Sequence, residues 1–235
     1  MKGPTEAQQT AQGATHLQTP FRDRRHAGRV LAGHLEHYRN RPNLLVLGLV
    51  RGGIPVAFEV ARALSAQLDI LVVRKIGYPG QEEYAIGAIA SGGVRVMNPR
   101  PGGTVAPDAL AAVVAREEAE LVRREHLYRG SRPAVAIAGR TVLVVDDGLA
   151  TGASMLAAVT ALRPQRPAHI AVAVPVSAPT TCKALREKAD AVVCPLTPQP
   201  FHAVGLWYED FAQTTDEEVE ALLDEARREH MAAHH

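Results

Sequence analysis

The chain has 235 residues, of which 46% are hydrophobic and 22% charged, and its net charge is +1. This composition is ordinary for a globular domain and excludes a wholly disordered chain or a coiled coil. The balanced charge, without a long basic block, argues against nucleic-acid binding and favours a small-molecule partner. Because no apolar run approaches the roughly 20 residues that span a bilayer, we expect no membrane contact and a cytoplasmic location.

Residues 1–20 are rich in Gln, Thr and Ala and poor in large apolar side chains, which predicts a disordered leader. From Asp23 to about Tyr38 the apolar residues recur at helical spacing, which predicts an amphipathic helix with Asp23 at or near its N-cap. The stretch Phe21-Arg22-Asp23-Arg24 has no other assigned role. The two cysteines, Cys182 and Cys194, lack metal-ligand spacing and are expected to fill apolar space in a reducing compartment.

Short apolar runs alternate with helical patterns over most of the chain, as in a sheet whose strands are buried on both faces. The alternation predicts a doubly wound α/β fold with a mostly parallel sheet. The expected strands are 43–50, 68–75, 141–145, 169–176 and 190–196, and the expected helices between them are 54–65, 153–162 and 178–187.

Two segments depart from the alternation. Residues 84–97 predict a β-hairpin that turns at Ser91-Gly92-Gly93, and residues 108–128 predict a long charged helix. From Pro195 onward the chain gains prolines and aromatic residues and ends in a helix that begins at Asp216, capped by Thr215. We therefore expect a core over 21–195 with an insertion at about 84–130, followed by a small C-terminal hood subdomain over 196–235.

The turn after 141–145 carries two adjacent carboxylates, Asp146 and Asp147, and then a run of small residues at a helix start. Small residues let backbone amides close around an anion at the positive end of a helix, with the Thr151 and Ser154 hydroxyls as further donors. Carboxylates beside a phosphate are repelled by it unless they accept hydrogen bonds from hydroxyls of the same ligand. A sugar phosphate with a vicinal diol meets both demands; the plain alternative is an acidic turn that ends a buried strand.

Two further strand ends carry basic residues. Glycines in 48–53 allow close backbone approach, and Arg51 there presents a planar fork suited to a diphosphate, although a structural turn explains the pattern equally well. The pair Arg74 and Lys75 precedes a Gly/Pro-rich stretch over 76–83, which predicts a mobile, phosphate-seeking loop or, alternatively, a plain hairpin connection.

The turn VLVVDDGLATGAS (142–154) resembles the phosphoribosyl diphosphate (PRPP) signature of the type I phosphoribosyltransferases, and the resemblance extends over about residues 21–225. It implies that Asp146 and Asp147 bind the ribose hydroxyls, with any metal contact made through those hydroxyls or through water. It also implies that Ala150, Thr151, Gly152, Ala153 and Ser154 bind the 5′-phosphate, and that Gly148 and Leu149 belong to the same PRPP-binding turn.

The other motifs are similar to parts of the same family. GLVRGGIPVA looks like the pyrophosphate loop, which implies that Val50, Gly52 and Gly53 join Arg51 there and that the Val50-Arg51 peptide is cis. VRKIGYPG is similar to the loop that closes over the diphosphate, with Lys75 as the main contact and Arg74 beside it. FHAVGLWYEDF resembles the base-binding hood, with three candidates for the acceptor: Phe201, Trp207 and Tyr208.

By this resemblance the chain is a pentosyltransferase of nucleotide metabolism that uses PRPP and Mg²⁺, in which a nitrogenous base or an amine displaces pyrophosphate. A homodimer is expected by analogy. One position departs from the family's purine enzymes, because Ala150 stands where they carry an aspartate that helps deprotonate the base. The acceptor is then already nucleophilic, or Glu83 or Glu209 serves as the base.

A different class of function is a non-catalytic protein that binds PRPP or a nucleotide as a regulatory signal. Retention of Arg51 and Lys75 argues against this, because a pure sensor has less need of groups that stabilise departing pyrophosphate. A phosphatase or receiver domain requires a phosphate-accepting aspartate with a suitable lysine or a D-x-D pattern, and neither is present.

Overall fold

The computed structural model describes residues 21–97 and 106–233, so the predicted leader over 1–20 lies outside the described residues. Five of the apolar runs form a parallel sheet in the order β2-β1-β6-β7-β8. All six residues of β1 are buried, as expected for a strand covered on both faces. The strands are β1 (Leu44–Leu49), β2 (Gln67–Leu71), β6 (Thr141–Val145), β7 (His169–Ala173) and β8 (Ala191–Val193).

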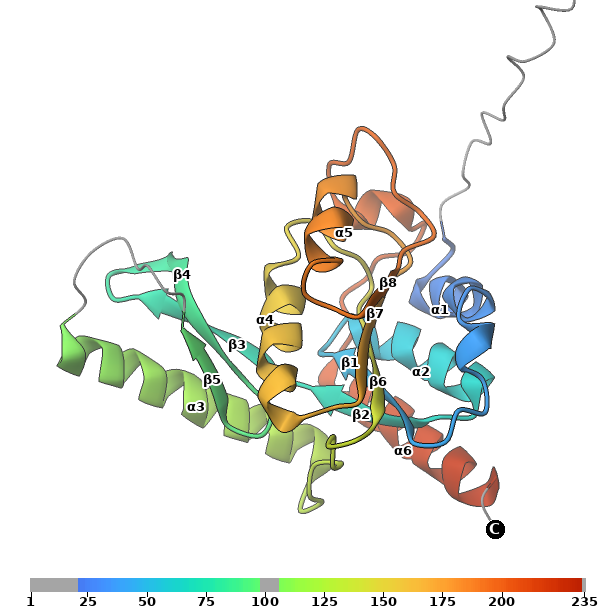
Figure 1. Cartoon of the computed structure of the whole chain (residues 1–235), viewed down its shortest axis with the longest axis horizontal. Coiled ribbons are helices and arrows are strands. Elements are labelled where there is room, and N and C mark those ends of the chain that lie inside the picture. Colours follow the sequence, from blue (N-terminus) through green and yellow to red (C-terminus); the bar gives the residue numbers. More distant parts are fainter. Residues whose placement is uncertain (1–20, 98–105, 234–235) are drawn as a thin grey trace, which may run out of the picture.

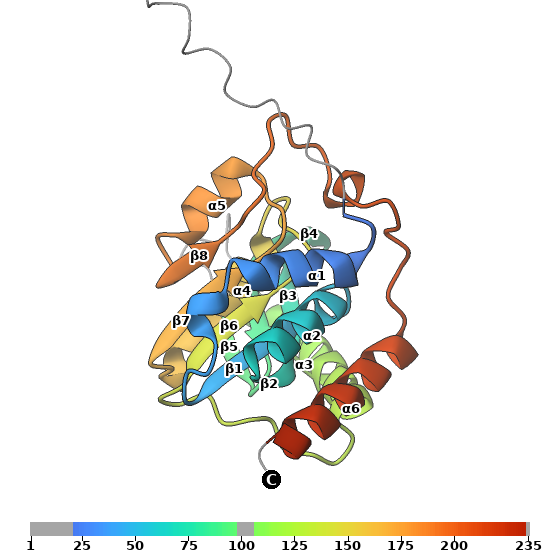
Figure 2. The ribbon, with the colours of Figure 1, turned by 90° about the vertical axis from the view of Figure 1, so that its right-hand side faces the viewer.

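Helices cover both faces of this sheet (Figures 1 and 2). On one face lie α1 (Arg24–Gly33) and α2 (Gly53–Leu64), and on the other lie α4 (Ala153–Leu162) and α5 (Pro179–Leu185). Each face has its own buried cluster, which joins aliphatic residues of the strands to those of the covering helices. The doubly wound α/β fold predicted from the alternation is confirmed.

The first helix is shorter than its apolar spacing predicted. It ends at Gly33 and continues as a 3-10 turn over Glu36–Tyr38, with the His34 amide donating to the carbonyls of Leu31 and Ala32. A glycine is a poor helix former, and the tighter turn still buries the later apolar positions of the pattern. The expected N-cap is present, because the Asp23 side chain accepts a hydrogen bond from the His26 amide.

A second, antiparallel sheet is inserted between β2 and β6. It consists of β3 (Val73–Tyr78), β4 (Gln81–Ala90) and β5 (Val94–Met97). The predicted single strand over 68–75 is therefore wrong: at Val72 the chain leaves the central sheet, and Val72 exchanges hydrogen bonds with Ser91. The β4–β5 hairpin and its glycine turn are confirmed. Of the two alternatives for the stretch after Lys75, a mobile loop or a hairpin connection, the structure has the hairpin, formed by β3 and β4 with its tight turn at Pro79-Gly80.

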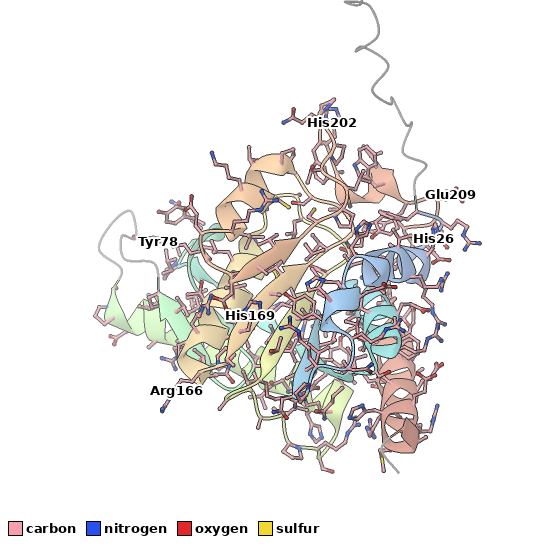
Figure 3. The ribbon with its side chains drawn as sticks, turned by 45° about the vertical axis from the view of Figure 1, so that its right-hand side comes forward. His26, Tyr78, Arg166, His169, His202 and Glu209 are labelled. Carbon is pink, nitrogen blue, oxygen red and sulfur yellow. The ribbon has the colours of Figure 1, made fainter. Side chains whose placement is uncertain are left out.

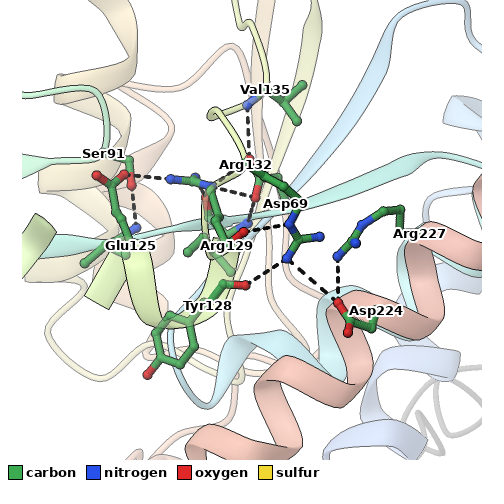
Figure 4. A network of polar contacts seen from close by, with 11 residues as sticks. Asp69, Ser91, Glu125, Tyr128, Arg129, Arg132, Val135, Asp224 and Arg227 are labelled. Carbon is green, nitrogen blue, oxygen red and sulfur yellow. Dashed lines mark hydrogen bonds and ion pairs between the residues drawn. The ribbon is translucent and has the colours of Figure 1, made fainter. Parts of the chain in front are cut away.

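The long helix α3 (Pro107–Arg129) packs on this second sheet through Val114 and Leu121, and the two form an arm that projects from the central sheet (Figure 1). A buried polar network fixes the root of the arm (Figure 4). Arg129 donates to the Asp69 carboxylate at 3.0 Å and to the Ile70 carbonyl at 2.8 Å, and the Val135 amide also donates to Asp69. A buried charge needs this full complement of partners.

The C-terminal segment runs back over the carboxyl ends of the strands. It contains a short 3-10 turn over Val204–Trp207 and ends in α6 (Asp216–Ala233), whose Thr215 cap accepts from the Glu218 amide as predicted. A further 3-10 turn follows α4 at Arg163–Gln165. Both cysteines are free, and no helix among the described residues has the length and apolar character that crossing a membrane requires.

Candidate active site

The paired carboxylates stand at the carboxyl end of β6, where the sheet's ligand-binding edge is expected. Asp146 and Asp147 are both mostly buried, and the Asp146 Oδ1 accepts a hydrogen bond of 2.9 Å from the Asp147 amide. Removal from water, together with the charge of Asp147, holds the pKa of Asp146 well above its ordinary value. Burial also raises the pKa of Asp147, against the opposing effect of Arg24. Two carboxylates are thus kept together at some cost in stability, which is typical of a binding site.

Arg24 provides the positive charge that faces this pair. Its Nε donates to Asp147 Oδ2 at 2.8 Å, and both side chains are largely buried, with 12% and 15% of their surface exposed. On the opposite side of the turn, the Tyr208 hydroxyl donates to the Asp147 carbonyl at 2.5 Å. Burial, followed by the charge of Asp147, raises the pKa of Tyr208, so the phenol stays a donor.

The small-residue turn begins inside the fold and ends at its surface. Gly148 and Leu149 are buried, and a Cβ at Gly148 would lie 2.5 Å from a Val204 methyl of the hood. Ala150, Thr151, Ala153 and Ser154 are exposed. Gly152 takes the left-handed conformation (φ 69°) and gives α4 no side-chain cap. The Ala153 amide donates a long hydrogen bond of 3.5 Å to the Thr151 hydroxyl. The amides of a helix's first turn lack partners within the helix, so this surface turn suits an anion.

The second turn, over 50–53, meets the first because β1 and β6 are neighbouring strands. The Val50-Arg51 peptide is cis, as the resemblance implied. A Cβ at Gly52 would lie 2.2 Å from Asp147 Oδ2, and one at Gly53 would lie 2.8 Å from the Val145 carbonyl. Only glycine permits this approach, so the carboxylate turn and the Arg51 turn form a single site.

Arg51 is held less firmly than Asp147. Its guanidinium lies 3.6 Å from Asp216 at the start of α6, and about a third of the side chain is exposed. Asp216 also accepts a 2.5 Å hydrogen bond from the Tyr128 hydroxyl of α3. Burial and this bond raise the pKa of Tyr128 to about 12. Arg51 thus lies close to a carboxylate that Tyr128 also binds, and its own side chain is only partly buried.

The two basic residues of β3 differ in their surroundings. Lys75 is exposed and lines a cavity of about 390 Å³ between the second sheet and α4, together with Ala153 of the phosphate turn. Arg74 lies instead at 2.7 Å from Glu117 of α3. In this structure Lys75 is adjacent to the predicted phosphate turn, while Arg74 helps to fix the arm.

The aromatic residues predicted to contact the acceptor pack mainly with one another. Phe201 and Trp207 lie against a buried cluster that contains Tyr208 and Phe21, and the rings of Phe21 and Tyr208 are 5.5 Å apart. The indole nitrogen of Trp207 is buried without a hydrogen-bond partner among the described residues. Figure 3 shows His202 at the outer end of this hood and Glu209 at the surface beside the start of α1. The side chain of Glu83 lies outside the described part of the structure.

The sequence patterns did not identify Arg24 and Asp216 as site residues. Arg24 pairs with Asp147, and Asp216 lies near Arg51. Neither stands near its partner in sequence, so no local spacing identifies the pair. The one available signal was the unexplained stretch Phe21-Arg22-Asp23-Arg24. It joins the hood through backbone hydrogen bonds between Phe21 and Trp207 and between Glu209 and Phe21.

The described residues offer few side chains that could bind a metal ion at this site. The residues described in the structure contain no group of three or more His, Cys, Asp and Glu side chains that could hold an ion. Two neighbouring carboxylates nevertheless suit Mg²⁺, which keeps several waters and is commonly bound by one or two carboxylates together with substrate phosphates. The donor set fits a metal that arrives with a phosphorylated ligand.

Comparison with known proteins gives consistent results. A family profile described as "Phosphoribosyl transferase domain" matches residues 23–206. Two Mycobacterium tuberculosis proteins, from strains CDC 1551 / Oshkosh and ATCC 25618 / H37Rv and both named "Putative phosphoribosyl transferase", are 44% identical over 211 residues, or 89% of this chain and 47% of each relative. The chain therefore spans about half the length of these relatives. The crystal structure of TT1426 from Thermus thermophilus is 46% identical, with a TM-score of 0.79 over 88% of this chain and 98% of that chain.

Proposed function

Because the chain belongs to the phosphoribosyl transferase domain family, we propose that it transfers the phosphoribosyl group of PRPP to a nitrogen nucleophile. The observation that carries the proposal is the meeting of two turns at the ends of β1 and β6. One presents two carboxylates and a surface helix start whose N-cap, Gly152, has no side chain, and the other presents Arg51, with Gly52 directly against Asp147. A ligand that carries a diol, a phosphate and a diphosphate matches these groups.

Acidic and basic residues would bind different parts of PRPP. Asp146 and Asp147 accept hydrogen bonds from the ribose hydroxyls, and the turn over 150–154 binds the 5′-phosphate at the start of α4. Arg51 and Lys75 stabilise the charge of the departing diphosphate, so that the protein acts by positioning and electrostatics without a covalent nucleophile. Mg²⁺, when bound with PRPP beside the Asp pair, neutralises diphosphate charge.

The chemistry at and around Ala150 limits which acceptors the site could use. Its methyl group cannot accept a proton, and its carbonyl is already bonded to the Thr181 hydroxyl at 2.6 Å. Glu209 is exposed, at the surface beside the start of α1 (Figure 3). We therefore favour an acceptor that arrives as a nucleophile, such as an amine or a base that is already anionic. A cytoplasmic location and a homodimer stay predictions.

Calorimetry with PRPP and Mg²⁺ tests the donor site. The parent chain is expected to bind PRPP, and the double variant Asp146→Asn with Asp147→Asn is expected to bind it about 100-fold more weakly, because two charge-assisted hydrogen bonds are lost. Equal affinities would remove the site assignment. A screen of amines, pyrimidines and purines for pyrophosphate release then separates an enzyme from a sensor, since a sensor binds PRPP and releases nothing with any acceptor.

A further inference from the structure

The guanidinium of Arg24 joins three parts of the chain that are far apart in sequence. Its Nε donates to Asp147 Oδ2 at 2.8 Å, and one terminal nitrogen donates to the Ala212 carbonyl at 2.6 Å. Its Cζ lies 3.9 Å from the centre of the Phe211 ring, within the range of a cation–π contact. The planar group is therefore fixed both in position and in orientation.

The backbone that carries Arg24 is also fixed. Arg24 is the first residue of α1, directly after the Asp23 cap, which accepts from the His26 amide at 2.6 Å. Further along, a Cβ at Gly28 would lie 2.7 Å from the Val56 carbonyl, so α1 lies in close contact with α2. A side chain that starts from this base reaches the carboxylate turn from a rigid support.

Asp147 needs such support because its neighbour carries the same charge. Two adjacent carboxylates repel each other, and in a partly buried site this repulsion favours rotation of one side chain away from the other. Arg24 supplies the opposing charge and occupies Oδ2. Arg24 binds one of the two carboxylate oxygens, Oδ2, and the ligand hydroxyl would bind the other, Oδ1.

We propose that Arg24 is a positioning residue, which holds Asp147 in the orientation that binds a ribose hydroxyl of PRPP. The proposal rests on the proposed function and deepens it. It assigns a role at the donor site to the N-terminal stretch Phe21-Arg22-Asp23-Arg24, which otherwise serves only to start a helix and pack on the hood.

The test compares Arg24→Gln and Arg24→Lys with the parent chain by calorimetry, using two probes: PRPP with Mg²⁺, and inorganic pyrophosphate without it. Pyrophosphate has no ribose, and without Mg²⁺ no metal links it to the Asp pair, so its binding does not depend on Asp147. Arg24→Gln is expected to weaken PRPP binding about tenfold and to leave pyrophosphate binding within about twofold, and Arg24→Lys is expected to recover part of the loss. Arg25→Gln is the matched control, because Arg25 is the next residue and pairs with Glu59 at 2.7 Å instead.

A crystal structure of unliganded Arg24→Gln gives an independent readout, in which the Asp147 carboxylate is expected to leave its present position. PRPP affinity equal to that of the parent, or an unmoved Asp147 side chain, would overturn the inference. A parallel loss of PRPP and pyrophosphate binding would overturn it too, because that pattern indicates a general defect of the fold. If the parent chain itself fails to bind PRPP, the proposed function fails, and the assignment of Arg24 to a ribose site fails with it.

Discussion

The carboxylate turn after β6 and the arginine turn after β1 lie side by side, but they hold their charges differently. Asp147 is bonded to Arg24 at 2.8 Å with both side chains largely buried, whereas Arg51 and Asp216 are 3.6 Å apart with 33% and 40% of their side chains exposed. A short buried pair fixes geometry, while a longer exposed pair contributes little and breaks easily. The difference indicates that the carboxylate turn is held in a fixed geometry and that the Arg51 side chain is held more loosely.

The largest effect is expected from removal of the positive charge of Arg51. Arg51→Gln is predicted to lower kcat for pyrophosphate release by about 100-fold, since loss of one group that stabilises developing charge commonly costs this much. PRPP affinity in calorimetry should fall far less. If the rate constant for pyrophosphate release in single-turnover measurements is also unchanged, Arg51 does not act on the leaving group.

The two carboxylates should respond to different extents when the unliganded chain is unfolded by urea. The folded-state pKa of each is raised, so its charged form lowers stability and replacement by Asn relieves that cost. Asp146→Asn is predicted to raise the free energy of unfolding by about 1 kcal/mol at pH 7, because desolvation and like-charge repulsion are relieved. Asp147→Asn is predicted to raise it less, because Arg24 loses its charged partner. A larger gain from Asp147→Asn than from Asp146→Asn would contradict the contrast between a paired and an unpaired carboxylate.

The hydrogen bond between Tyr128 and Asp216, beside Arg51, should affect the stability of the protein at high pH. The folded-state pKa of Tyr128 is raised to about 12 from its ordinary value of 10.0. Its contribution to stability is therefore fully present below pH 10 and is lost as the pH rises toward 12. Tyr128→Phe is predicted to cost about 1 kcal/mol at pH 8 and to reduce the decline in stability above pH 10. Chemical unfolding at pH 8 and pH 11 measures both, and an equal decline in parent and variant would exclude Tyr128 as its source.

The smallest effect is expected at the loose pair itself. Asp216→Asn keeps an acceptor for the Tyr128 hydroxyl and removes only the charge near Arg51. The KM for PRPP is predicted to change by no more than about twofold, because a half-exposed ion pair contributes at most about 1 kcal/mol. A tenfold change in this KM would mean that Asp216 fixes the position of Arg51. The two turns would then hold their charged side chains equally firmly, against the contrast drawn above.

Much of the fold could be predicted from periodicity. The parallel strands, the covering helices and the β4–β5 hairpin follow from apolar runs, helical spacing and glycines, which act over a few residues. The exchange of strand partners at Val72 could not be predicted this way, because it depends on Ser91, nineteen residues away. The ion pair between Arg74 and Glu117 of α3 could not be predicted either, because the position of Arg74 beside Lys75 gives no indication of it.

The sequence by itself determined the carboxylate turn and the arginine turn, since each is a run of neighbouring residues whose chemistry and backbone freedom are local properties. Only the tertiary structure decided what holds those turns. Arg24 reaches Asp147 across 123 residues, and Asp216 reaches Arg51 from the opposite end of the chain. Such pairings depend on where α1 and α6 pack, and packing is settled by the whole buried surface of the protein and not by any one stretch of it.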